Sequence, residues 1–543
     1  MDLTAVAAFI FAFMFPSCHT SDPGPTETTL GRSFIAAVYE HRVILNPEPH
    51  VALARPAALQ HLHANLDEYE RQAARAARQG VQILVFPEDG LQGFNFSRSS
   101  IAGYLETIPD PQQESWNPCT EPGRHNNTEV LQRLSCMARR HGLYLVANMA
   151  DLQPCPLTSD PSSSCPSDGH WQFNTNVVFS SDGLLVARYH KHNLYFEKAF
   201  DKPPHPEIIT FDTPFAGRFG VLTCFDLLFH EPTVTLVKRG VRQLVYPTGW
   251  MNQLPLMAAV QFQRAFSLGA NVSILAANIR SDPLGMTGSG IFSPMSGLHH
   301  HARQGDAEEG RLLVATVPVL DPLWTGEEVE KQAAPQSGER NRETMEEVRG
   351  ESCSSRPVDS GFCLKEERYV DSPPPGASAP SPPPSPATFT SSMMYDPFTF
   401  ALLHGTEGEL SVCDGPLCCH LQYRQSLQSS STELYALGAF AGTHTVNGRY
   451  ALQVCALVRC AGSEASSCGQ EVEEAETKMD FLLEGTFGTP YVYPSVLASG
   501  LVLEQPERLE RTADGGMALR HSNMSAGLVT ACLYGRMYHL DLD

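Results

Sequence analysis

Cys224 is the residue of this sequence best placed for covalent chemistry. It ends the apolar run Arg218-Phe-Gly-Val-Leu-Thr-Cys224, which predicts a buried strand that stops just before Asp226. The carboxyl end of a strand is where α/β proteins expose nucleophiles, and a thiolate attacks carbonyl carbon readily. A buried cysteine is more commonly structural, so this run alone does not decide between the two interpretations.

Two further predicted strands end in ionisable residues. Glu88 follows the apolar run 81–86, where partial burial would raise its pKa toward that of a general base. Lys191 follows the predicted strand 184–188, and its ammonium could stabilise an oxyanion. Taken alone, Glu88 is more typical of a strand-terminating turn and Lys191 of a solvated basic turn. Glu88, Lys191 and Cys224 each end a predicted strand of the same α/β unit, and this combination favours a catalytic role for them.

The surrounding pattern alternates strand-like and helix-like segments over residues 31–322. In 56–79, apolar residues recur at three- and four-residue spacing between Pro56 and Gly80, which predicts a helix. Asp182-Gly183 predicts the turn of a hairpin. We therefore expect an α/β layered domain. Its predicted strands are 33–39, 81–86, 143–148, 176–179, 184–188, 243–246 and 273–277, and its other predicted helices are 128–141, 231–239 and 255–268.

Length and charge narrow the class of protein. The 543 residues exceed what one compact core accommodates, so we expect at least two domains. The 38 basic and 60 acidic residues give a net charge of −22, which argues against a nucleic-acid partner.

The two ends of the chain indicate export. The apolar stretch 3–15 is too short to span a bilayer and is followed by small and polar residues, so we predict a cleaved signal peptide over 1–20 and a secreted, extracellular protein. The polar segment 534–543 lacks the tail of a GPI anchor, and we expect no membrane anchor.

The fifteen cysteines also fit an oxidising compartment. Fourteen cysteines remain besides Cys224, and cleavage of the predicted signal peptide would remove Cys18. Thirteen are then left, an odd number, so one of them must be unpaired. We predict that Cys532, in an apolar strand-like run, is the unpaired one.

Four sequons are present. We expect glycans at Asn95 and Asn126 and a further candidate at Asn523. Asn271 leads into the apolar run 272–277, and we expect it to carry none.

The composition changes twice after residue 322. Residues 326–394 are first Glu/Arg-rich and then Ser/Pro-rich, which predicts a disordered linker or insertion, one that Cys353 and Cys363 could tie. From 395 to 543 apolar β-like runs return with seven cysteines, which predicts a β-rich, disulfide-containing domain without an evident catalytic set.

Three motifs resemble the nitrilase superfamily of carbon–nitrogen hydrolases. They are Phe86-Pro-Glu88, Tyr189-His-Lys191-His-Asn-Leu and Thr223-Cys224-Phe-Asp226. The resemblance implies a nitrilase-like α-β-β-α sandwich, with Glu88 as general base, Lys191 as oxyanion stabiliser and proton donor, and Cys224 as nucleophile. The reaction that this resemblance implies requires no cofactor.

A metal reading of His190 and His192 is disfavoured, because no cysteine or acidic residue nearby completes a zinc spacing.

Longer stretches resemble the biotinidase and vanin (pantetheinase) group within that superfamily. The clearest are Lys191-His-Asn-Leu-Tyr-Phe-Glu197, Tyr246-Pro-Thr-Gly-Trp-Met-Asn252 and, after the linker, Val454-Cys-Ala-Leu-Val-Arg-Cys460. Gly249 stands where the group more usually has Ala. The run 252–257 and the missing anchor signal are most like the biotinidases.

The resemblance implies an amidohydrolase with a small-molecule substrate, acting through a Cys224 thioester. Biocytin (biotinyl-lysine) and biotinyl peptides are the expected substrates. Pantetheine is the alternative substrate. Two alternatives from other functional classes are a catalytically dormant biotin-binding protein and a structural glycoprotein. Trp250, Tyr195 and Phe94 are candidate pocket residues. A monomer is favoured.

Overall fold

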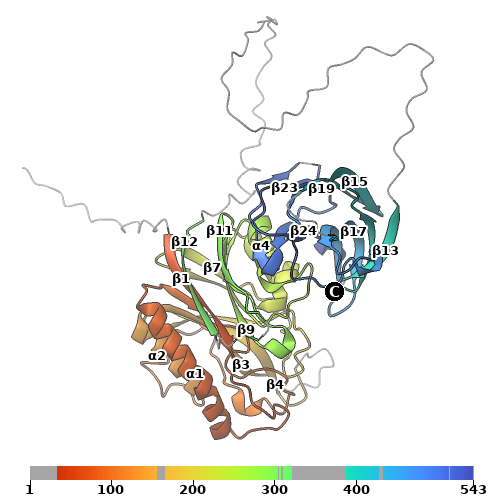
Figure 1. Cartoon of the computed structure of the whole chain (residues 1–543). Helices are drawn as coiled ribbons and strands as arrows, with labels where there is room; N and C mark the ends of the chain where they lie inside the picture. Colours follow the sequence, from red (N-terminus) through yellow and green to blue (C-terminus); the bar gives the residue numbers. More distant parts are fainter. Residues whose placement is uncertain are drawn as a thin grey trace, which may run out of the picture.

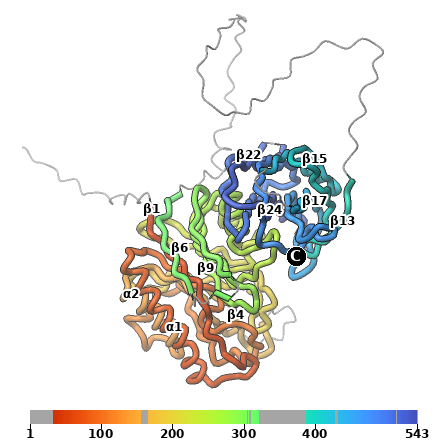
Figure 2. Tube along the Cα trace, in the orientation of Figure 1, coloured from red at the N-terminus to blue at the C-terminus, as the bar shows by residue number. Residues whose placement is uncertain are grey.

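The computed structural model describes residues 33–155, 165–303, 305–306, 310–320, 387–426, 432–512 and 514–541. An α/β body, red to green, and a β-rich body, teal to blue, lie against each other (Figure 1, Figure 2). The predicted signal peptide, Cys353, Cys363 and most of the predicted linker lie outside the described residues.

Two sheets form the centre of the α/β body. The first has the order β12-β1-β2-β3-β4-β5, with β1, β2 and β3 parallel, and the second runs β6-β7-β8-β9-β10-β11. They connect where β1 pairs with β9 at His41 and Ile279. Their strands are β1 (Ser33–Arg42), β2 (Ile83–Val85), β3 (Tyr144–Pro154), β4 (His170–Phe179), β5 (Leu185–His190), β6 (Thr210–Thr213), β7 (Gly217–Val221), β8 (Gln243–Thr248), β9 (Ser273–Arg280), β10 (Ser289–Ser293), β11 (Ser296–His300) and β12 (Gly310–Pro318).

Helices cover the outer faces of these sheets. The helix α1 (Arg55–Ala77) buries Leu62, Leu66 and Tyr69 beside α2 (Glu129–His141), on the first sheet. On the second sheet lie α3 (Thr235–Lys238), preceded by η3 (His230–Val234), and α4 (Ala259–Ala270). A separate apolar core fills the space between the sheets. The predicted α-β-β-α sandwich is confirmed.

The turn that carries Cys224 differs from the prediction. The strand β7 ends at Val221, and Cys224 is instead the first residue of a short 3-10 helix, η2 (Cys224–Leu228). Thr223 and Asp226 form a reciprocal capping box, in which each side chain accepts from the backbone N–H of the other residue. The apolar sequence therefore leaves the sheet three residues before the thiol.

The β-rich body is a sandwich of two antiparallel sheets around one apolar core. The seven-stranded sheet contains β13 (Thr388–Met393), β14 (Asp396–Leu402), β17 (Tyr435–His444), β18 (Tyr450–Arg459), β24 (Leu528–Arg536), β20 (Val492–Ala498) and β21 (Val502–Leu503). The five-stranded sheet contains β15 (Glu407–Asp414), β16 (Leu417–Gln425), β19 (Met479–Thr486), β23 (Gly516–His521) and β22 (Arg508–Arg511). This confirms the predicted β-rich C-terminal domain.

One part of the linker prediction is wrong. Residues 388–393, which composition assigns to the linker, form the edge strand β13 and pair with β14 along its length. Their serines and threonines belong to an edge strand whose residues are half exposed, so a polar sequence suits it. The remaining helical turns of the chain are η1 (Ala102–Tyr104), η4 (Asp282–Leu284), η5 (Ala465–Ser467), η6 (Ser499–Leu501) and η7 (Tyr538–Leu540).

Disulfides join five cysteine pairs within the described residues. Cys224 and Cys532 are free and buried there, as predicted for Cys532. Two bridges lie in the α/β body and three in the sandwich, where Cys419–Cys455 connects the two sheets. The others are Cys119–Cys136, Cys155–Cys165, Cys413–Cys418 and Cys460–Cys468.

The two bodies share an apolar core beside η2. The helix α4 packs on β20, and aromatic residues of β18, β20 and β24 join one cluster with Cys224 and Trp250. The buried Arg536 donates from Nε to the Leu228 carbonyl at 2.9 Å, across the interface. Its guanidinium also lies over the Tyr450 ring, 4.9 Å from the centroid. The sandwich is thus fixed directly against the turn that carries the thiol.

Candidate active site

The structure brings Glu88, Lys191 and Cys224 together. Glu88 follows β2, Lys191 follows β5, and Cys224 opens η2. Lys191 Nζ donates to Glu88 Oε1 at 2.6 Å, and the charge of the Glu88 carboxylate acts on the neighbouring Cys224 thiol. All three are buried, with exposed fractions of 2%, 2% and 6%. A thiol, a carboxylate that can take its proton and a fixed ammonium therefore share one water-poor site.

Glu88 is held by three donors. Its Oε1 also accepts from Asn174 Nδ2 at 2.8 Å, and its Oε2 accepts from the Gly249 backbone N–H at 2.9 Å. Burial acts to raise the pKa of Glu88, but the Lys191 charge and the hydrogen bonds outweigh it and lower that pKa. The expectation of a raised pKa is therefore wrong for the resting site, since the Lys191 ammonium stabilises the carboxylate.

Gly249 determines how much space is left beside the Glu88 carboxylate. A Cβ at this position would lie 3.3 Å from Glu88 Oε2, a contact tighter than most. Glycine thus leaves more room beside Glu88 than the alanine that is usual in the related group.

Cys224 lies in a backbone conformation rare for a residue with a side chain. Its φ of 42° falls in the left-handed region, which costs on the order of 1 kcal/mol and lifts the thiol out of the apolar run. Burial, followed by the Glu88 charge, raises the pKa of the thiol well above its ordinary value. The resting pair is therefore a neutral thiol next to an ionised carboxylate.

This protonation state gives a prediction for the pH dependence of the thiol. Because the pKa of Cys224 is raised, its thiolate should form only as the pH rises above the ordinary cysteine range. The difference in ultraviolet thiolate absorbance between the wild type and Cys224→Ser should therefore be absent at neutral pH and appear only in strong alkali. A thiolate signal at neutral pH would contradict the assignment of Glu88 as the base that removes the proton.

Sequence reasoning missed a second carboxylate, Glu197. Lys191 Nζ donates to Glu197 Oε1 at 2.8 Å, and Asn174 Nδ2 donates to the same oxygen at 2.7 Å. Burial raises the pKa of Glu197 to about 7, against the lowering effect of Lys191. The signal was present in the sequence, because Glu197 ends the same motif that Lys191 begins. The ammonium is thus held between two carboxylates and cannot rotate away.

The acidic residues here do not form an open cation site. Oxygens of Glu88, Asp89 and Glu197 lie within 4.8 Å of one another. The Lys191 ammonium bonds two of these carboxylates and so supplies the positive charge itself. Burial, then the Glu88 and Glu197 charges, raise the pKa of Asp89 well above its usual value. The His190 ring contacts Asp151 and Glu207 at 2.9 Å each.

Asp226 ties the lysine loop to the cysteine turn. Its Oδ1 accepts from the backbone N–H of Asn193 at 2.9 Å, and its Oδ2 accepts from the Tyr189 hydroxyl at 2.7 Å. The same Oδ2 accepts from the Thr223 N–H at 3.1 Å. One buried carboxylate therefore sets the distance between the segments that carry Lys191 and Cys224.

A pocket opens over the thiol. The α/β body lines it with Cys224 and with mainly apolar and aromatic residues, and the sandwich supplies residues around the β17–β18 turn. Trp250 and Tyr195 line it as expected, whereas Phe94 packs instead beside Val43, Ile279 and Met286. From the α/β body come Tyr195, Phe225, Leu228, Gly249, Trp250, Met251, Gln253 and Met257, and from the sandwich come His444, Val446, Asn447 and Tyr450.

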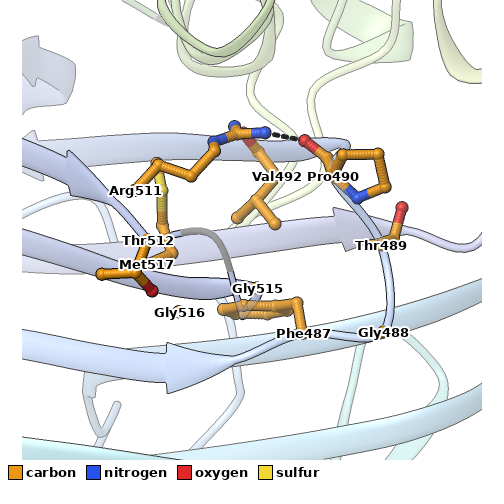
Figure 3. A pocket seen from close by; sticks show the side chains of 10 residues that line it. All are labelled: Phe487, Gly488, Thr489, Pro490, Val492, Arg511, Thr512, Gly515, Gly516 and Met517. Carbon is orange, nitrogen blue, oxygen red and sulfur yellow. Dashed lines mark hydrogen bonds between the residues drawn. The ribbon is translucent and has the colours of Figure 1, made fainter. Parts of the chain in front are cut away.

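A second hollow lies within the sandwich, far from these groups in sequence (Figure 3). Its lining includes Phe487, Met517 and Arg511 but neither a thiol nor a carboxylate. The Arg511 guanidinium already donates to the Pro490 carbonyl. Because this hollow has no thiol paired with a carboxylate, the candidate active site is the pocket at Cys224.

Comparison with known proteins agrees with this geometry. The carbon-nitrogen hydrolase family matches residues 49–278, and the Vanin C-terminal domain matches residues 387–541. A biotinidase of Takifugu rubripes is 66% identical over 95% of this chain and 97% of the relative. This chain belongs to the biotinidase and vanin branch of the carbon–nitrogen hydrolases. As a member of that branch it is an amidase that acts on carbon–nitrogen bonds.

More distant relatives of this branch also match. A pantetheinase of Sus scrofa is 43% identical over 94% of this chain and 90% of its own length. Among solved structures, an amidase from Nesterenkonia sp. is 20% identical, covers 56% of this chain and 97% of that chain, and superposes with a TM-score of 0.36.

Proposed function

We propose that this amidase hydrolyses the amide of biocytin and of biotinyl peptides, releasing biotin through a thioester on Cys224. The observation that carries the chemistry is the buried ion pair of Glu88 and Lys191, whose charges act on the Cys224 thiol. The similarity to a biotinidase along almost the whole chain supports the substrate.

The first half of the reaction transfers the acyl group to sulfur. Glu88 takes the proton of the Cys224 thiol, and the sulfur attacks the amide carbonyl carbon. The negative charge that develops on the carbonyl oxygen is stabilised by the Lys191 ammonium and by the backbone N–H of Phe225 at the start of η2. The tetrahedral intermediate then expels the amine, which leaves with the proton that Glu88 holds.

The second half consumes one water and restores the thiol. Glu88, again a carboxylate, takes a proton from water as the oxygen attacks the thioester carbonyl. The carbon–sulfur bond breaks, the acid is released, and the proton returns to Cys224. Glu197 holds Lys191 throughout, since the ammonium bonds it as well as Glu88. The sum is one amide and one water converted to one acid and one amine.

Pantetheine is the second candidate substrate, and the similarity to pantetheinases favours it. A side-by-side assay decides between the two. We expect the secreted wild-type protein to release lysine from biocytin with a kcat/KM at least about tenfold above that for pantetheine, because a pocket matched to one acyl group discriminates by roughly that factor or more. A preference for pantetheine would overturn the proposed substrate while leaving the amidase chemistry intact.

We further infer that the protein is extracellular and glycosylated. Five disulfides within the described residues support an oxidising environment. None of the described helices is long and apolar enough to cross a membrane. The side chains of Asn95, Asn126 and Asn523 are exposed, as a glycan requires. Asn271 is exposed as well, at the end of α4, so the buried strand after it does not cover it.

A further inference from the structure

The wall of the pocket opposite the α/β body holds a buried histidine–aspartate pair that the reaction above does not use. His444, the last residue of β17, contacts Asp396, the first residue of β14, through Nδ1 and Oδ2 at 2.7 Å. Each is 5% exposed. The His444 ring also packs on Tyr450, with centroids 4.7 Å apart. Two neighbours therefore fix the orientation of this ring.

The pair defines what His444 can offer a ligand. A carboxylate accepts hydrogen bonds, so the Nδ1 that faces Asp396 carries the hydrogen in the neutral ring. The other nitrogen, Nε2, then has a free lone pair and is an acceptor for N–H or O–H groups. Asn447, three residues further along the pocket wall, adds an amide with both donor and acceptor atoms.

The turn that carries Asn447 is built to reach the active site. Gly448 has a φ of 143°, and a Cβ there would lie 2.8 Å from Cζ of Phe225, the residue after the nucleophile. Glycine thus permits this close approach. Asn447 itself has a φ of 57°, in the left-handed region that asparagine tolerates better than most residues. The sandwich therefore places a polar group beside η2.

Apolar residues make up much of the remaining wall of the pocket. Trp250, Met257 and Leu228 line it. An acyl group with a hydrocarbon chain and a polar head matches this combination of apolar and polar surfaces. The acyl group is also the part of the substrate that must stay bound after the amine leaves, because the thioester has still to be hydrolysed. The pocket over Cys224 is therefore the place for the acyl group.

We propose that His444 and Asn447 of the C-terminal domain bind the polar head of the acyl group, a cyclic urea in the biotinyl case, and so determine acyl specificity. This rests on the proposed function. The urea N–H groups would donate to His444 Nε2 and to the Asn447 side-chain oxygen, and its carbonyl would accept from the Asn447 amide. Asp396 is the positioning residue that keeps Nε2 an acceptor.

The test compares two amides of one reporter amine, a biotinyl amide and a pentanoyl amide that lacks the urea. His444→Gln and Asn447→Ala should each lower kcat/KM for the biotinyl amide by about 10- to 100-fold, mainly by raising KM, because a buried polar group loses its partner. Turnover of the pentanoyl amide should stay within about twofold of the wild type. Asp396→Asn should give the same selective loss, of smaller size.

His420→Gln serves as the matched control. His420 is an exposed histidine of the same domain and is hydrogen-bonded to Ser411 at 2.6 Å, so both substrates should be unaffected. Equal losses on both amides for His444→Gln and Asn447→Ala would indicate a structural role and overturn the proposal, as would no loss on either. Failure of the proposed function looks different, because the wild type itself would then hydrolyse the pentanoyl amide but show no preference for the biotinyl amide.

Discussion

Replacing Cys224 by alanine or serine is expected to reduce amide hydrolysis by on the order of 10³-fold or more, because no acyl intermediate can form on sulfur. The protein should still fold, since the alteration removes one sulfur from a site that Asp226 and Thr223 organise independently. The measurement is kcat/KM on biocytin with purified protein, together with mass spectrometry of the intact chain during turnover. The wild type should show the mass of an acyl adduct, and the variants should not.

Cys532→Ala is the matched control for this experiment. Cys532 is the second free and buried cysteine of the described chain, and burial raises its pKa as it does for Cys224. It lies on β24 and does not line the pocket. Its replacement should cost about 1 kcal/mol of stability through lost packing and leave turnover unchanged. Full activity of Cys224→Ser would remove Cys224 as the nucleophile.

Replacing Glu88 by glutamine is expected to slow both acylation and deacylation, each by about 10²- to 10⁴-fold, because the same carboxylate accepts a proton in both steps. Glutamine keeps the size of the side chain and can still accept from Gly249, so the pocket should be preserved. Rapid-quench mass spectrometry of the acyl enzyme gives the two rates separately. Loss of acylation alone would restrict Glu88 to the first half of the reaction.

Glu40→Gln is the corresponding control. Glu40 is also fully buried, and burial raises its pKa to about 7, but it accepts from Thr287, Gly288 and Ser289 rather than from Lys191. Its replacement should leave both rates unchanged. If Glu88→Gln behaved like Glu40→Gln, another base would have to be sought, and Glu197 is the other carboxylate that accepts from Lys191.

The sequence predicted much of the secondary structure, because periodicity and turn residues are local signals, and it singled out three positions that the structure brings together. The helix at 56–79 and the hairpin around Asp182-Gly183 are examples. The end of β7 was misplaced, since Leu222 and Thr223 are as buried as a strand but belong to the turn. The pKa of Glu88 was misjudged for a different reason. The direction of the pKa shift depends on the contact of Glu88 with Lys191, and these two residues are far apart in the chain.

The part of the site that sequence could not provide comes from the C-terminal domain. His444 and Asn447 are separated from Cys224 by the rest of the α/β body and by the predicted linker, and no local pattern distinguishes them from ordinary turn residues. Their position follows from the packing of α4 on β20 and from the contact of Arg536 with Leu228, both of which are tertiary. A domain without an evident catalytic set nevertheless forms part of the pocket.

The protonated state of Cys224 has a consequence for how the chain matures. Disulfide exchange proceeds by attack of a thiolate, and its rate falls with the fraction of thiol that is ionised and accessible. Cys224 is buried, and its pKa is raised. In the folded protein its thiol should therefore exchange only slowly with the five disulfides. The same features that make Glu88 necessary for each turnover keep the nucleophile inert between turnovers. An enzyme with a preformed thiolate would be exposed to mixed disulfides with any small thiol in an oxidising medium.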